Sequence, residues 1–358
     1  MSRFIVLFII IGALLSYVFC HIWVIVPFPK WGKWLAVGVA VACFCSIFLG
    51  FSGALDKMPL GWGSFFYNLG NKTLIILFYA LMVFVLLDLG RLVHLVPRQW
   101  LHDNWISSAA ITTLLAIVFI GGSIHYHNKQ RVALNIDSHG KVQHPLTAVM
   151  ASDLHIGYHN RRAELARWVD MINAENPDLI LFAGDIIDMS LRPVVEEDMA
   201  SEFRRLKAPI YACLGNHEFY SNLPRAKQFY HDAGINLLID SSATVGDLQI
   251  IGRDDRTNNS RRPLSSFDIH DSQFSILLDH QPYHLEEAEQ AGIDLQLSGH
   301  THNGQVWPLN WVIKALYECG WGQHQRGNTS YYVSSGLGLW GAKYRIGTNS
   351  EYVVIYIK

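Results

Sequence analysis

Four long apolar runs occupy the first third of the chain, whereas short apolar runs separated by polar segments occupy the rest. The long runs contain 18 to 23 residues, the length that a helix rising about 1.5 Å per residue needs to cross a bilayer core of about 30 Å. Tryptophans lie at the ends of these runs, as is typical of membrane interfaces. The first run ends in Trp-Val-Ile-Val-Pro, so we interpret it as a retained helix and not as a cleaved signal peptide. The pattern predicts a transmembrane region, residues 1–125, with about four helices at 4–26, 34–55, 74–96 and 105–122.

Four spans place both ends of the chain on one side of the membrane. Six basic residues of the connections lie on that side and four on the other, which favours the cytoplasm for the second part of the chain. We therefore expect an integral protein of the cell (inner) membrane. Near the end of the third run, Asp88, Arg91 and His94 share one predicted helix face. Their spacing fits either an intramembrane proton or ligand site or an ion pair that extends to the interface.

The two parts of the chain differ in charge. Residues 126–358 contain 21 Lys and Arg against 27 Asp and Glu, a net charge of −6. An acidic part argues against a nucleic-acid surface, which would need a basic stripe. The five cysteines have no Cys-x-x-Cys spacing, so neither a zinc knuckle nor a disulfide framework is indicated. Residues 126–144 are polar and predict a linker with room for a first edge strand, followed by a globular domain at 145–358.

The globular part alternates short apolar runs with segments of helical periodicity. Predicted strands at 146–151, 179–183 and 210–214 alternate with helices at 161–173 and 194–206, a pattern typical of βαβ units around a mainly parallel sheet. Later segments predict mostly strands, with one helix at 283–290. These strands are at 237–239, 244–251, 274–278, 294–297, 331–334 and 352–357. We therefore expect an α/β fold, a two-sheet sandwich with sites on the loops beyond the strands.

Side chains that bind metals follow the predicted strands in five short motifs. The motifs are Asp153-Leu154-His155, Gly184-Asp185-Ile186-Ile187-Asp188, Gly215-Asn216-His217-Glu218, Asp279-His280 and Gly299-His300-Thr301-His302. Because ligands of open α/β folds bind beyond the carboxyl ends of the strands, we expect these side chains to converge on one sheet edge. Carboxylate, imidazole and amide donors without thiolates suit Mn, Fe, Zn, Co or Ni. The metal-ligand candidates are Asp153, His155, Asp185, Asn216, His280, His300 and His302.

In this order, the five motifs resemble those of the calcineurin-like metallophosphoesterase superfamily, over residues 146 to about 358. The resemblance implies two divalent metal ions, with Asp185 shared between them. One ion would be held by Asp153, His155, Asp185 and His302, and the other by Asp185, Asn216, His280 and His300. It also implies that His217 acts on the phosphoryl group or the leaving oxygen without binding a metal, and that Asp188 orients it. We expect Glu218 to be a carboxylate at a helix start and not a ligand.

The resemblance further implies a metal-dependent phosphohydrolase that cleaves phosphoesters by a metal-bridged hydroxide. Met189-Ser190 stands where protein phosphatases continue with Arg-Gly, so we expect a phosphodiesterase or pyrophosphohydrolase acting on a lipid-linked or nucleotide-type substrate. The alternative is a membrane transport or sensor protein with a regulatory, catalytically silent metal-binding domain. The presence of both His217 and Asp188 argues against this alternative.

Three further features concern the surroundings of the motifs. Asn303 stands where many bacterial relatives have glycine, so it either narrows the pocket or adopts a left-handed backbone. The aromatic segment 306–321, with Trp307 and Trp311, predicts either a cap that dips into the bilayer and admits a lipid phosphoester or a flap packed on its own domain. His159 is expected to be an ordinary core or solvated residue. Five arginines are candidate phosphate or headgroup binders, namely Arg161, Arg162, Arg253, Arg261 and Arg262.

Overall fold

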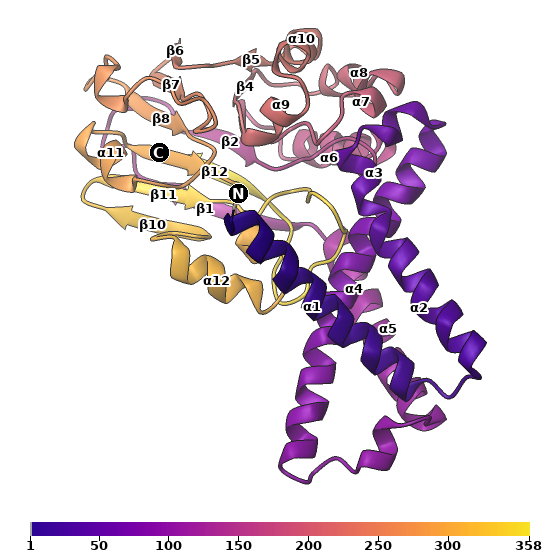
Figure 1. Ribbon diagram of the computed structural model, residues 1–358. Coiled ribbons are helices and arrows are strands. Elements are labelled where there is room, and N and C mark those ends of the chain that lie inside the picture. The colour runs from indigo at the N-terminus through magenta and orange to yellow at the C-terminus, as the bar shows by residue number, and fades with distance from the viewer. Residues whose placement is uncertain (1) are drawn as a thin grey trace. The chain divides into compact units, whose positions relative to one another are not determined.

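The computed structural model describes residues 2–358 and divides into two compact units, one up to Ser123 and one from Ile124 to Lys358. Figure 1 shows helices throughout the first unit, in indigo and purple, and strands flanked by short helices in the second. Residue 1, with which the predicted membrane region begins, lies outside the described residues.

The first unit is helical, and helices satisfy their own backbone polar groups, as a lipid environment would demand. Its elements are α1 (Ser2–Ile25), α2 (Lys30–Cys45), α3 (Ile47–Phe51), η1 (Ala54–Lys57), α4 (Leu60–Leu92), η2 (Arg98–Leu101) and α5 (Trp105–His127). Within residues 2–358, three stretches are long and apolar enough to cross a membrane, namely Lys30–Phe51, Leu60–Leu92 and Trp105–His127. The apolar stretch found in α1, Ile9–Ile25, is shorter. The topology of four spans therefore stays a prediction.

The third predicted span corresponds to α4, which begins well before residue 74. Asp88 does not pair along its own helix as expected. Its Oδ2 accepts a hydrogen bond of 2.7 Å from the Tyr17 hydroxyl and lies 3.1 Å from His21 Nε2, both on α1. The expectation that His94 shares the face of Asp88 and Arg91 is wrong, because α4 ends at Leu92 and His94 has a φ of +60°. Asp88 thus joins two helices of this unit.

The second unit contains two six-stranded mixed sheets, within residues 124–358 that the structure describes completely. The first sheet has the order β1 (Gln130–Ile136), β12 (Glu351–Ile357), β2 (Leu146–Ala151), β3 (Leu179–Ala183), β4 (Ile210–Cys213) and β5 (Asn236–Leu237). The second has the order β10 (Gly322–Arg326), β11 (Thr329–Val333), β9 (Leu295–Ser298), β8 (Phe274–Leu278), β7 (Leu248–Gly252) and β6 (Ser241–Val245). Strands β2 to β5 are parallel, and so are β7, β8, β9 and β11. The expected two-sheet α/β fold is confirmed.

Alternation of side chains along the strands builds two apolar layers. In β3, Leu179 and Leu181 belong to the core between the sheets, whereas Ile180 and Phe182 face the helices on the outer side of the first sheet. This is the period of two that a strand imposes. The strand is buried over all five residues, which explains its continuous apolar run.

Helices cover the outer faces of the sheets, and several differ from the predicted elements. They are α6 (Arg162–Ala174), α7 (Arg192–Glu196), α8 (Met199–Phe203), α9 (Asn216–Tyr220), α10 (Leu223–Asp232), α11 (Leu285–Gln290) and α12 (Leu309–Leu316), with η3 (Leu264–Ser266) and η4 (His302–Gly304). The single helix expected at 194–206 is two short helices, α7 and α8, because Asp198 between them has a left-handed backbone. The single strand expected at 244–251 is the β6–β7 hairpin, which turns at Gly246 with φ +56°. The edge strand β1 lies within the segment 126–144.

Candidate metal centre

All seven predicted ligands lie just beyond the carboxyl ends of five strands. Asp153 and His155 follow β2, Asp185 follows β3, and Asn216 follows β4 in the first sheet. In the second sheet, His280 follows β8, while His300 and His302 follow β9. Neighbouring parallel strands end at the same edge of a sheet. Residues separated by up to 149 positions in the chain are therefore brought together.

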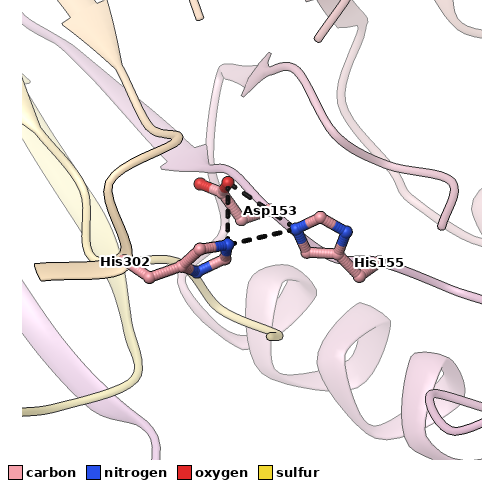
Figure 2. Close-up of side chains that lie close together, drawn as sticks. All are labelled: Asp153, His155 and His302. Carbon is pink, nitrogen blue, oxygen red and sulfur yellow. Dashed lines mark hydrogen bonds and ion pairs between the residues drawn. The ribbon is translucent and has the colours of Figure 1, made fainter. Parts of the chain in front are cut away.

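The first group comprises Asp153, His155 and His302, shown in Figure 2. His155 Nε2 lies 3.2 Å from His302 Nε2 and 3.8 Å from Asp153 Oδ1, and His302 Nε2 lies 3.5 Å from the same oxygen. Asp185 Oδ2 lies 3.7 Å from His155 Nε2. Two ligands about 2.1 Å from one ion at angles of 90° to 110° would be about 3.0 to 3.5 Å apart. The observed donor separations are close to this spacing, and the three residues are buried.

The second group comprises Asp185, His280 and His300. His280 Nδ1 lies 2.7 Å from the Ala183 carbonyl oxygen and donates to it, which leaves Nε2 as the nitrogen that would bind a metal. This Nε2 lies 3.1 Å from Asp185 Oδ2, so the two atoms are close enough to bind one cation together. Asn216 Oδ1 lies 3.0 Å from His300 Nδ1 and adds an amide oxygen to the group. The donors of both groups therefore fit divalent metal ions, and Asp185 Oδ2 of the second group lies 3.7 Å from His155 Nε2 of the first.

The backbone at these positions is unusual. Five of the seven candidate ligands have left-handed φ values between +45° and +73°, namely Asp153, His155, Asp185, His300 and His302. Non-glycine residues adopt such values rarely, Asp and His more readily than most, and such residues cluster at functional sites. Asn303 has φ +48°, which confirms the left-handed backbone expected of it.

Two glycines allow the ligand loops to approach each other. A Cβ at Gly215 would lie 2.1 Å from Asp185 Oδ1, and a Cβ at Gly299 would lie 2.3 Å from Asp153 Oδ2. Any other residue at these positions would push a candidate ligand away. The glycines of two sequence motifs thus allow the ligand loops to pack closely.

His217 and Asp188 lie beside the first group. His217 Nδ1 is 3.2 Å from Asp188 Oδ1, and the backbone N–H of His217 donates to Asp185 Oδ1 at 2.9 Å. Asp188 is also 3.6 Å from His155 Nδ1 and 3.8 Å from His159 Nδ1. The sequence analysis missed His159, which is buried and bound through Nε2 to the Leu339 carbonyl. Asp188 therefore contacts three imidazoles and not one. His155, Asp185 and His217 also form a third group with metal-ligand spacing.

Burial and neighbouring charges shift the pKa values of the candidate ligands and of Asp188. Burial alone would raise the pKa of Asp185 and Asp188, but the neighbouring histidines outweigh it and lower both pKa values. Burial lowers the pKa of His300 to about 4 and that of His302 to about 3, so both imidazoles are neutral at pH 7. Burial alone would lower the pKa of His155 and His280, but the neighbouring aspartates outweigh it and raise both pKa values, that of His155 to about 10. Because a metal binds the neutral imidazole, an ion would displace a proton from each of these two histidines.

Glu218 supports the centre without joining a ligand group. Its carboxylate is fully buried and accepts hydrogen bonds from the backbone of Gly215 at 2.8 Å, Ile187 at 2.9 Å and Asp185 at 3.3 Å. Burial raises its pKa to about 7. The residue starts α9 in a capping arrangement, as expected, and fastens the loop after β3 to the loop after β4.

The five candidate arginines all have protein partners. Arg253 and Arg261 both bind Asp279, which precedes His280, at 3.2 and 2.9 Å. Arg161 and Arg162 bind the carboxylates of Glu197 and Glu202, and Arg262 donates to the Asp240 carbonyl. These contacts explain the arginines without a phosphate.

Two groups of oxygen and nitrogen donors at one edge of a two-sheet sandwich are what the sequence motifs led us to expect of a metal-dependent phosphoester hydrolase. Residues 146–304 match the calcineurin-like phosphoesterase family. The chain is 32% identical over 233 residues to an uncharacterised metallophosphoesterase of Bacillus subtilis, which covers 59% of this chain and 78% of that protein. The chain belongs to the calcineurin-like phosphoesterase family, whose members use a dinuclear divalent metal centre.

Two other relatives extend the similarity. An uncharacterised metallophosphoesterase of Campylobacter jejuni is 28% identical over 255 residues, which are 68% of each chain. A transmembrane protein with metallophosphoesterase domain from Danio rerio is 28% identical over 315 residues, or 79% of this chain and 71% of that protein. The latter alignment is longer than the second unit, which has 235 residues.

Proposed function

We propose that the protein is a membrane-anchored phosphohydrolase of phosphodiesters or pyrophosphates, with two metal ions held as the sequence motifs imply. Asp153, His155 and His302 would hold one ion, and Asn216, His280 and His300 the other. Asp185 would bind both. The observation that carries this proposal is the position of Asp185 Oδ2, 3.7 Å from His155 Nε2 and 3.1 Å from His280 Nε2.

Two divalent ions held there would supply positive charge to the phosphoryl oxygens and acidify a water molecule. The protein's own contribution to proton transfer would come from His217. Its Nδ1 lies 3.2 Å from Asp188 Oδ1, and this contact fixes the orientation of the ring. The opposite nitrogen, Nε2, is then the atom that gives a proton to the leaving oxygen.

The substrate is proposed to be lipid-linked or nucleotide-type, hydrolysed at the cytoplasmic face of the inner membrane. The long apolar helices support a substrate available at a bilayer, and the charge distribution of the connections supports the cytoplasmic side. A silent regulatory domain would have no need of a paired His217 and Asp188, so the hydrolase is the better account.

The test is hydrolysis of bis(p-nitrophenyl) phosphate by the full chain in detergent, with each of several divalent metals. We expect turnover with at least one metal, and a fall in kcat of about 10²- to 10⁴-fold in His217→Ala. Asp188→Asn should lower kcat less, and the double variant should be no worse than His217→Ala, because the two act as a unit. His231→Ala, at an exposed histidine, is the matched control. Absence of turnover in folded, metal-loaded protein would refute the hydrolase.

A further inference from the structure

The short helix α12 turns its apolar side away from the protein. None of its eight residues is buried. Its exposed apolar side chains are Leu309 at 37%, Trp311 at 62%, Val312 at 50% and Leu316 at 68%. At 100° per residue these positions cover one continuous arc, whereas the less exposed Asn310 and Ile313 form the side toward the domain. An ordinary surface helix has the opposite arrangement.

The orientation of α12 is fixed by the loop that carries His302. A Cβ at Gly304 would lie 2.4 Å from the backbone of Leu309 and Asn310, so η4 and the start of α12 are packed backbone to backbone. Ile313 packs on Gly320 in the same way, since a Cβ there would lie 2.5 Å from its Cγ2. Backbone packing therefore fixes the direction in which the exposed apolar arc of α12 faces.

Aromatic side chains extend the surface on both sides of the helix. Trp307 and Trp321 are 40% and 45% exposed, and the rings of Trp307 and Trp311 are 5.4 Å apart. Tryptophan combines a large apolar ring with one polar N–H, which is why it is enriched where a protein meets the headgroup layer of a membrane. Lys314, exposed at the edge of the arc, suits the same layer.

We propose that α12 is an interfacial helix that inserts its outer side, Leu309, Trp311, Val312 and Leu316, into a lipid bilayer. The proposal concerns binding alone and does not depend on the hydrolytic reaction. The bilayer is favoured because only Asn128 and Lys129 connect α5, which is apolar enough to cross a membrane, to β1. Such a connection spans at most about 11 Å, so a membrane crossed by α5 would hold β1 close to its surface.

A second copy of the chain is less suited than a bilayer to cover the apolar side of α12. An eight-residue helix is about 12 Å long and about 10 Å wide, so its outer side offers far less than the roughly 800 Å² per partner of a stable protein interface. Shallow insertion into lipid needs no partner of matching shape.

The experiment places the photo-crosslinking residue p-benzoylphenylalanine at position 312 in the full chain, reconstituted in phosphatidylethanolamine–phosphatidylglycerol nanodiscs. Val195 on α7, 57% exposed, is the matched control for Val312. After irradiation, mass spectrometry should find lipid adducts at position 312 and none above background at 195. Equal lipid yields at the two positions, or adducts at 312 with protein only, would overturn the proposal.

A second variant excludes a trivial loss of folding. Trp311→Gln combined with Leu316→Gln, in the chain labelled at 312, should abolish the lipid adduct while the Tm of the chain in detergent is unchanged. A persistent adduct would show that the apolar side chains do not drive the contact. Since crosslinking needs no turnover, failure of the proposed hydrolase and failure of this surface are separate results.

Discussion

Arg345 is a buried arginine that ties two loops of the metal centre together. Its side chain is 1% exposed, and burial lowers its pKa to about 10, so it is charged at pH 7. Nη1 donates to the His302 carbonyl at 2.6 Å, Nη2 donates to the Ser335 carbonyl, and Nε donates to Ser350 Oγ at 3.1 Å. The loop at Ser335 continues into Gly336, where a Cβ would lie 3.0 Å from the Cβ of Asp153. Arg345→Met should therefore disturb both the fold and the ligands.

The magnitude follows from the three hydrogen bonds. Hydrogen bonds to a charged group contribute about 1.5–3 kcal/mol each, or roughly 4–9 kcal/mol for three. Methionine also removes the cost of burying the charge, which is several kcal/mol. We therefore expect a net loss of about 2–4 kcal/mol, equivalent to a fall in Tm of about 4–16 °C for a unit of this size. Because His302 would lose its backbone anchor, the metal concentration for half-maximal activity should rise about 10- to 100-fold.

The assay uses the full chain in detergent. Thermal unfolding in the presence of a chelator measures stability, and hydrolysis against free Mn²⁺ concentration measures metal affinity. Arg131→Met is the control, because Arg131 makes a two-point contact with Glu175, at 2.9 Å through Nε and through Nη2. This pair is partly exposed, so the control should cost less than about 1 kcal/mol and leave the Mn²⁺ requirement unchanged. Equal Mn²⁺ requirements in the two variants would refute the anchoring role of Arg345.

Two further predictions concern buried ionisable groups. Glu218→Gln leaves one acceptor oxygen for the three N–H groups of Gly215, Ile187 and Asp185. The Mn²⁺ concentration for half-maximal activity should therefore rise about 10- to 100-fold. An unchanged Mn²⁺ titration would contradict the role of Glu218 in holding the ligand loops. Burial lowers the pKa of Lys129, whose Nζ lies 3.5 Å from the ring centroid of Tyr126, well below 10.5. At a pH between that lowered pKa and 10.5, Lys129 binds a proton in the unfolded chain but not in the folded one, so stability should rise with pH. Denaturant unfolding of Lys129→Met should show a smaller rise of stability with pH. An equal rise would refute the lowered pKa of Lys129.

The strands that support the centre were predictable because each is a short apolar run ended by a polar motif. The predicted bounds of β2, β3 and β8 agree with the structure. The sequence analysis did not predict β10, because the residues Gly322–Arg326 are glycine and polar side chains and form no apolar run. The sequence analysis predicts a cap or a flap for the aromatic segment after His302. The sequence of the eight-residue helix α12 does not by itself indicate which of its sides faces away from the protein.

Residues that act through distant contacts were not predictable either. No local motif distinguishes His159 from the other histidines, because its partners, Asp188 and the Leu339 carbonyl, lie elsewhere in the chain. Arg345 lies 43 residues after His302 in a loop without a motif, and only the fold brings the guanidinium to the carbonyl. Local motifs thus predict groups that would touch metal, whereas the groups that hold those ligands in place depend on tertiary packing.

The two oxygens of Asp185 connect the metal groups to the proposed proton donor. Oδ2 faces His155 and His280, while Oδ1 accepts the backbone N–H of His217 at 2.9 Å. Loss of activity in Asp185→Asn would therefore combine weaker metal binding with a displaced His217. Asp188 contacts the side chains of His217 and His155 without sharing Oδ2 of Asp185. A variant at His217 itself, compared at saturating metal, is consequently the cleaner measure of proton transfer, and Asp188→Asn measures how far that transfer depends on the orientation of the ring.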